Sequence, residues 1–140
     1  MERYRGRISG PLLDRIDLHV EVPSLTYEEM TSLRQAEGTA TVRARVEEAR
    51  RLQHERLRGA SIFCNANMGA REVREHCRHD DSCARLLEGA IRALGHSARG
   101  FARVLKVART IADLAGESRI GLTHVAEAIQ YRERGISSFG

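Results

Sequence analysis

A helical pattern of apolar residues between residues 98 and 115 constrains the fold of this chain more than any other feature. Apolar side chains recur there every three or four positions, as on the buried face of an amphipathic helix. Ser97 precedes the segment and is a good N-cap residue, and Gly100 is the only glycine or proline within it. The pattern predicts one long helix with this apolar face: Phe101, Val104, Leu105, Ala108, Ile111, Ala112 and Ala115. Polar residues share the opposite face, namely Arg99, Arg103, Lys106, Thr110 and Asp113.

Helices are also predicted for most of the remaining chain. Residues 24–38 form an acidic segment that indicates a short helix or a mobile linker. Longer helices are expected in residues 39–58, where Gly59 ends the pattern, and in residues 67–77, 80–93 and 122–132. Asn67 is the expected cap of the second of these helices, and Asp80 or Asp81 of the third. The expected fold class is therefore mainly α, a bundle of about five helices.

Residues 16–22 follow a different pattern. Apolar and polar residues alternate in the sequence IDLHVEV, and this period of two predicts a short β-strand with one buried face, which Pro23 ends. Pro11, ahead of it, suits a turn followed by the start of a short helix. Arg15 then lies where a helix meets a strand. Such a junction would hold its backbone firmly while its side chain reached a phosphate on another subunit.

The segment PLLDRIDLHVEVP resembles the arginine-finger segment of the magnesium-chelatase-like AAA+ ATPases, the ComM or YifB family. The resemblance implies that Arg15 acts in trans, inserting into the nucleotide site of the neighbouring subunit. There it would stabilise charge on the transferring phosphoryl group, an effect worth about a thousandfold or more in rate. From the residues alone a structural role stays open, in which Arg15 pairs with Asp14 or Asp17 and orients a turn.

The segment SARGFARVLKVARTIADLAG resembles the sensor 2 helix of the family's lid domain, and IGLTHVAEAIQYR resembles its closing helix. The resemblance implies that Arg99 acts in cis and contacts the γ-phosphate of the nucleotide that its own subunit binds. A helix start also offers free N–H groups and a partial positive charge, which suit a phosphate. The resemblance assigns no role to Arg103, Lys106 or Arg109, for which a solvated or interhelical basic face is favoured.

The chain has no phosphate-binding loop of its own. Its single lysine, Lys106, does not lie in a GxxxxGK[ST] motif, and no apolar strand ends in paired acidic residues. We therefore expect no ATP binding or hydrolysis by this chain alone, with ATP and Mg²⁺ as cofactors of a longer protein. The expected domains are residues 1–24, the C-terminal edge of an AAA+ core with the finger segment, and residues 25–140, the helical lid domain with the sensor 2 helix.

Charge and composition narrow the class of protein further. The net charge of +4 is compatible with nucleic-acid binding, but glutamates interleave with the arginines of residues 39–58, so a solvated or subunit-facing helix is favoured there. No apolar run is long enough to span a membrane and no signal peptide is present, so we expect a cytoplasmic protein without membrane contact.

A group of potential metal ligands lies in the middle of the chain: His76, Cys77, His79, Asp80, Asp81 and Cys83. Their spacing matches no established zinc pattern, so we expect no metal site. Together with Cys64, the cysteines make an odd number without a CxxC pair, which is typical of reduced thiols.

The resemblance also implies a function. Members of the family are expected to form homo-oligomeric, hexameric rings. These rings couple ATP hydrolysis to movement on DNA, including branch migration in recombination and natural transformation. The partners would be an upstream ATPase core, neighbouring ring subunits and DNA. Two alternatives remain open: the ATPase subunit of magnesium chelatase, which drives metal insertion into a porphyrin, and a freestanding helical nucleic-acid-binding module in which Arg15 and Arg99 are structural.

Overall fold

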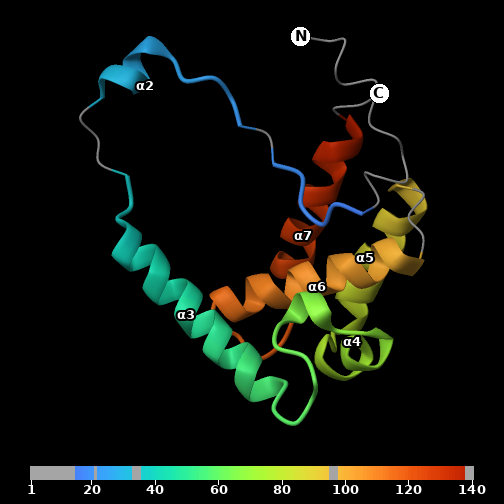
Figure 1. Cartoon of the computed structure of the whole chain (residues 1–140). Coiled ribbons are helices and arrows are strands. Elements are labelled where there is room, and N and C mark those ends of the chain that lie inside the picture. Colours follow the sequence, from blue (N-terminus) through green and yellow to red (C-terminus); the bar gives the residue numbers. More distant parts are fainter. Residues whose placement is uncertain (1–14, 21, 33–35, 95–97, 138–140) are drawn as a thin grey trace.

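The computed structural model describes residues 15–20, 22–32, 36–94 and 98–137, and most of these are helical. The long helix α6 (Ala98–Leu114) packs against the elements that surround it in Figure 1. In chain order, the other elements are α2 (Tyr27–Thr31), α3 (Thr39–Arg56), the 3-10 turn η2 (Asn65–Asn67), α4 (Ala70–His76), α5 (Asp81–Leu94) and α7 (Leu122–Ser137). The mainly helical fold class is thus confirmed. No helix in these ranges is long and apolar enough to cross a lipid bilayer.

The β-strand predicted for residues 16–22 is not found in the part of this segment that the structure describes, residues 16–20 and 22. Its alternating apolar side chains are exposed, from 38% at Ile16 to 84% at Val22. A strand requires the hydrogen bonds of a neighbouring strand, and the described ranges contain none. The alternation is therefore real in the sequence, but nothing in this part of the chain pairs with it.

The starts of α5 and α4 test the predicted helix caps. Asp80 caps α5 as predicted, because its carboxylate accepts a hydrogen bond from the backbone N–H of Cys83 at 2.9 Å. A hydrogen bond from Ser82, followed by those from Cys83, lowers the pKa of Asp80 to about 2. The prediction that Asn67 caps the preceding helix is wrong: Asn67 lies in η2, and α4 begins at Ala70.

A glycine fixes the end of α6. Gly116 has a φ of +73°, which glycine adopts without strain. The N–H of Gly116 donates to the carbonyl of Asp113, and the N–H of Glu117 donates to the carbonyl of Ala112. This pair of hydrogen bonds is a Schellman motif, which ends the helix and turns the chain toward α7. Gly59, with a φ of +89°, lies in the turn after α3, where the sequence predicted the helix to stop.

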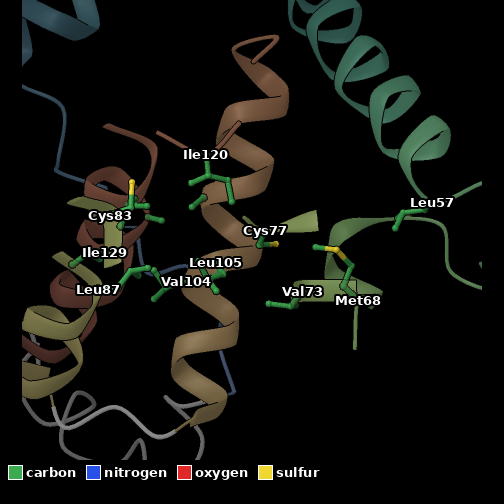
Figure 2. Packing of buried hydrophobic residues seen from close by; sticks show 13 residues of the cluster. Leu57, Met68, Val73, Cys77, Cys83, Leu87, Val104, Leu105, Ile120 and Ile129 are labelled. Carbon is green, nitrogen blue, oxygen red and sulfur yellow. The ribbon is translucent and has the colours of Figure 1, made fainter. Parts of the chain in front are cut away.

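The apolar core lies around α6. Leu87 from α5 and Ile129 from α7 lie on one side of α6, and Val73 and Met68 lie on its other side (Figure 2). The apolar face predicted for α6 is confirmed for its central residues, which are at most 4% exposed: Val104, Leu105, Ala108 and Ala112. Ala115 is exposed, because it follows the end of the helix.

Helix α3 joins this core only through its C-terminal half. Ala49 and Gln53 are buried, while Val42 and Val46, on the same side of the helix, are 37% and 47% exposed. Figure 1 shows the N-terminal half of α3 extending away from the other long helices. Only the C-terminal half of this side of α3 is therefore covered by the described part of the chain.

The polar face of α6 is buried at its C-terminal end, which the sequence analysis did not predict. Asp113 is 1% exposed and accepts hydrogen bonds from three other side chains. Arg56 of α3 donates both of its Nη groups to the carboxylate, and its Nη1 lies 3.0 Å from Oδ2. Asn65 of η2 donates to Oδ2 at 2.8 Å, and Arg109, one turn earlier in α6, donates to Oδ1 at 3.0 Å. One carboxylate thus joins three elements of the fold.

Arg109 extends this network beyond the helix. Its side chain is also 1% exposed, and it donates hydrogen bonds to the backbone carbonyls of Glu117 and Ser118 after the end of α6. Burial lowers the pKa of the Arg109 guanidinium from its ordinary value, and the charge of Asp113 opposes this shift. Of the two environments considered for this arginine, the interhelical one is confirmed.

We predict that Asp113→Ala lowers the free energy of unfolding of this chain by about 3–5 kcal/mol, because it leaves two buried or partly buried guanidinium groups without their carboxylate. Urea unfolding followed by circular dichroism measures the change. Glu88→Ala is the matched control, since it removes an exposed ion pair with Arg92 and should cost less than about 1 kcal/mol. Equal losses in the two variants would contradict a structural role for the network.

Candidate functional site

Arg15 lies in a turn at the edge of the fold, and its side chain is exposed. It forms no hydrogen bond or ion pair with the residues that the structure describes. Asp17, one of the two carboxylates considered as its structural partner, pairs with Arg103 at 3.1 Å instead, and Asp14 lies outside the described residues. Within the described residues, the exposed guanidinium of Arg15 thus has no carboxylate partner.

The backbone that follows Arg15 is held on the helical bundle. The carbonyl of Ile16 accepts a hydrogen bond from Nη1 of Arg132 in α7 at 3.1 Å. Three residues after Ile16, the backbone N–H of His19 donates a hydrogen bond of 2.9 Å to the carbonyl of Tyr131, also in α7. Figure 1 shows this segment, in dark blue, passing beside α7.

The same segment crosses an apolar groove of about 300 Å³ between α6 and α7. Leu18 lines the groove together with side chains of both helices, among them Val107, Ile111 and Tyr131. Polar contacts at residues 16, 17 and 19 thus attach one short segment to two helices, and Leu18 lines the groove between them.

Arg99 lies in the first turn of α6 and is exposed. Like that of Arg15, its side chain makes no ion pair or hydrogen bond within the described ranges. Ser97, the predicted cap of this helix, lies outside them. The partial positive charge at a helix start and the guanidinium of Arg99 both favour a phosphate.

The structure does not bring Arg15 and Arg99 into contact, but it connects them through α6. Residues four apart in a helix lie on one side, so Arg99 and Arg103 share a face, and Arg103 holds Asp17, two residues beyond Arg15. The other two α6 residues without an assigned role also contact other segments, since Lys106 donates to the carbonyl of Ala66 in η2 at 3.0 Å and Arg109 donates to the carbonyls of Glu117 and Ser118.

Sequence reasoning missed the contacts of Asp17 and Arg132, although one signal was present. Arg132 continues the helical stripe formed by Val125, Ala128 and Ile129, and it is 3% exposed. An arginine at a core position of an amphipathic helix indicates a buried acceptor. The acceptor, the carbonyl of Ile16, is 116 positions away in sequence, and no local pattern identifies it.

The potential metal ligands of residues 76–83 do not converge. Within the described residues no group of three or more such side chains is close enough to hold a metal ion. Cys77 and Cys83 are buried in the apolar core, His79 contacts the carbonyl of Cys77 through its ring nitrogen, and Asp80 caps α5. These four residues thus make structural contacts.

The three thiols differ in environment. Burial raises the pKa of Cys77 to about 11 and also raises that of Cys83. The Cys64 thiol is only partly buried, and although burial acts to raise its pKa, hydrogen bonds from the backbone N–H of Asn67 and from Arg50 lower it.

We predict that iodoacetamide at pH 7.5 modifies Cys64 at least about tenfold faster than Cys77 or Cys83, because the thiolate is the nucleophile and only Cys64 combines a lowered pKa with exposure. Mass spectrometry of proteolytic peptides measures the three rates, and the urea-unfolded chain, in which the rates should become similar, is the control. Modification of Cys77 at the rate of Cys64 would contradict the buried environment of Cys77.

Comparison with known proteins identifies the family. Residues 36–132 match the C-terminal model of magnesium chelatase, subunit ChlI, and residues 1–30 match the model of magnesium chelatase, subunit ChlI. The chain is 43% identical over 131 residues to the competence protein ComM of Haemophilus influenzae, and 40% identical over 131 residues to the uncharacterized protein YifB of Escherichia coli. Each alignment covers 93% of this chain and 25% of the relative, so the chain spans about a quarter of the length of these relatives. The chain therefore belongs to the magnesium chelatase ChlI family, as its resemblance to the ComM and YifB proteins predicted.

Proposed function

We propose that this chain supplies the arginine finger and the helical lid of a ComM-like AAA+ ATPase. The observation that carries the proposal is the arrangement of Arg15: its guanidinium is exposed and unpaired within the described residues, while the backbone next to it is anchored on the bundle. A finger needs both properties, because it must reach another subunit and yet be held in a defined place.

The chemistry of this chain in such a ring is electrostatic. Arg15 would enter the nucleotide site of the neighbouring subunit and donate hydrogen bonds to the phosphoryl oxygens that gain charge during transfer. The planar guanidinium can bind two oxygens at once, which a lysine cannot do. Arg99 would contact the γ-phosphate in its own subunit, aided by the first turn of α6. The remainder of a longer protein would bind ATP and Mg²⁺.

For the whole protein, we propose a cytoplasmic homo-oligomeric ring, a hexamer, that uses ATP hydrolysis to move on DNA and drives branch migration in recombination and natural transformation. The support is the 43% identity to a protein named for competence. The upstream ATPase core, the neighbouring subunits and DNA are the proposed partners.

The family description favours one alternative function, the ATPase subunit of magnesium chelatase, which would drive metal insertion into a porphyrin. Stimulation of ATP hydrolysis by partner chelatase subunits would support this alternative, and stimulation by branched DNA would support the ComM-like function. A freestanding nucleic-acid-binding module has less support. Two arginines of α3 pair with glutamates and are thus less available to nucleic-acid phosphates: Arg45 pairs with Glu37, and Arg51 with Glu48 and Glu55.

The test is a mixing experiment on the full-length protein that carries this chain. Arg15→Ala should lower kcat by roughly a thousandfold, as should a variant without the P-loop lysine. Rings that contain both variants should regain ATPase activity, because the lysine variant still offers Arg15 to the intact nucleotide site of its neighbour.

Arg92→Ala is the control for Arg15→Ala, since Arg92 is also exposed but pairs with Glu88 on α5. The Arg92→Ala variant should keep full activity. Native mass spectrometry should show that mixed rings form. Mixed rings as inactive as their parts would rule out a finger that acts between subunits.

A further inference from the structure

We propose that Asp17 and Arg132 are positioning residues for Arg15, and that they make the arginine finger move with the lid of its own subunit. This inference rests on the proposed function of Arg15 and Arg99. It adds a direct connection between the nucleotide bound in one subunit and the finger offered to the next.

Arg132 of α7 holds the backbone next to Arg15, at Ile16. Arg132 is 3% exposed, so the surrounding core of α7 fixes its guanidinium in place. That guanidinium donates to the carbonyl of Ile16, the residue next to Arg15. Consecutive Cα atoms are about 3.8 Å apart, so holding Ile16 restricts the backbone of Arg15 to a small region beside α7.

The finger segment also contacts α6, through Asp17. Asp17 pairs with Arg103 at 3.1 Å; the Arg103 side chain is 21% exposed and that of Asp17 53% exposed, so the ion pair is shielded from water mainly on its Arg103 side. Arg103 lies four residues, about 6 Å along the helix axis, from Arg99. The residue proposed to read the γ-phosphate and the residue that holds the finger segment are therefore neighbours on one rigid helix.

Within the described residues, the finger segment makes its contacts with these two helices. Its described contacts at residues 16–19 are all made with α6 or α7 or with the groove between them. Helices α6 and α7 share the apolar core, so they move as one body. A phosphate that draws Arg99 and thus the lid toward it will displace residues 16–19, and Arg15 with them.

The test uses the mixed rings of the full-length protein described above. One subunit, the acceptor, carries Arg15→Ala and keeps its nucleotide site. The other, the donor, lacks the P-loop lysine but keeps its finger. Asp17→Asn, which removes the charge of Asp17 at nearly constant size, is placed either in the donor or in the acceptor.

We expect Asp17→Asn in the donor to lower the recovered ATPase rate about tenfold or more, because a misplaced catalytic group loses rate steeply. In the acceptor, which has no finger to position, the same substitution should change the rate less than about twofold. Asp17→Glu in the donor keeps the charge and should retain most of the activity. Glu88→Gln in the donor, which removes an exposed ion pair on α5, should have no effect.

The outcomes separate the two proposals. Failure of the unsubstituted mixture to recover activity overturns the finger itself, and the coupling with it. Recovery that is unaffected by Asp17→Asn in the donor overturns the coupling alone. Equal losses in donor and acceptor assign Asp17 a structural role in every subunit and also overturn the coupling.

Discussion

The carboxylate of Asp113 is the interaction on which the rest of this structure depends. It is almost fully buried at the end of α6 and binds Arg56 of α3, Asn65 of η2 and Arg109 of its own helix. Neither an isolated buried carboxylate nor an isolated buried guanidinium is tolerated in a protein interior, so each group makes the burial of the others acceptable. Through Arg109 the same network holds the turn toward α7, and α7 in turn carries Arg132, which holds Ile16. The position of the candidate finger, Arg15, thus depends on Asp113 at the C-terminal end of α6, whereas Arg99 lies at the N-terminal end of the same helix.

Helix α6 serves as the central element because it has two buried faces of different chemistry. One face is apolar and packs between the helices of the core, which gives affinity without direction. The other face is polar over the stretch from Arg103 to Asp113 and makes directional contacts with residues 17, 65 and 66 and with α3. Directional contacts fix the register of the surrounding segments, and this is the property that a site with two separated arginines requires.

The helices were predictable from the sequence, and the contacts between their polar residues were not. The spacing of Val104, Leu105, Ala108 and Ala112 determines the core face of α6, since helical periodicity is a local property. The pairing of Asp113 with Arg56 cannot be predicted from local sequence, because Arg56 lies 57 positions away and nothing distinguishes it from the other arginines of α3. The strand prediction is not confirmed within the described residues for a related reason: the alternation at residues 16–22 is local, but a strand exists only beside another strand. Arg15 and Arg99 were found through family resemblance, and the structure adds what lies between them.

The contact between Arg132 and Ile16 also bears on how a ribosome delivers this protein. The two residues are 116 positions apart, so Arg132 is synthesised well after Ile16. During synthesis at about 5–20 residues per second, the segment therefore waits for several seconds before its docking surface exists. During this interval the backbone next to Arg15 lacks its hydrogen bond to α7. The defined place that we propose for the finger thus depends on completion of α7.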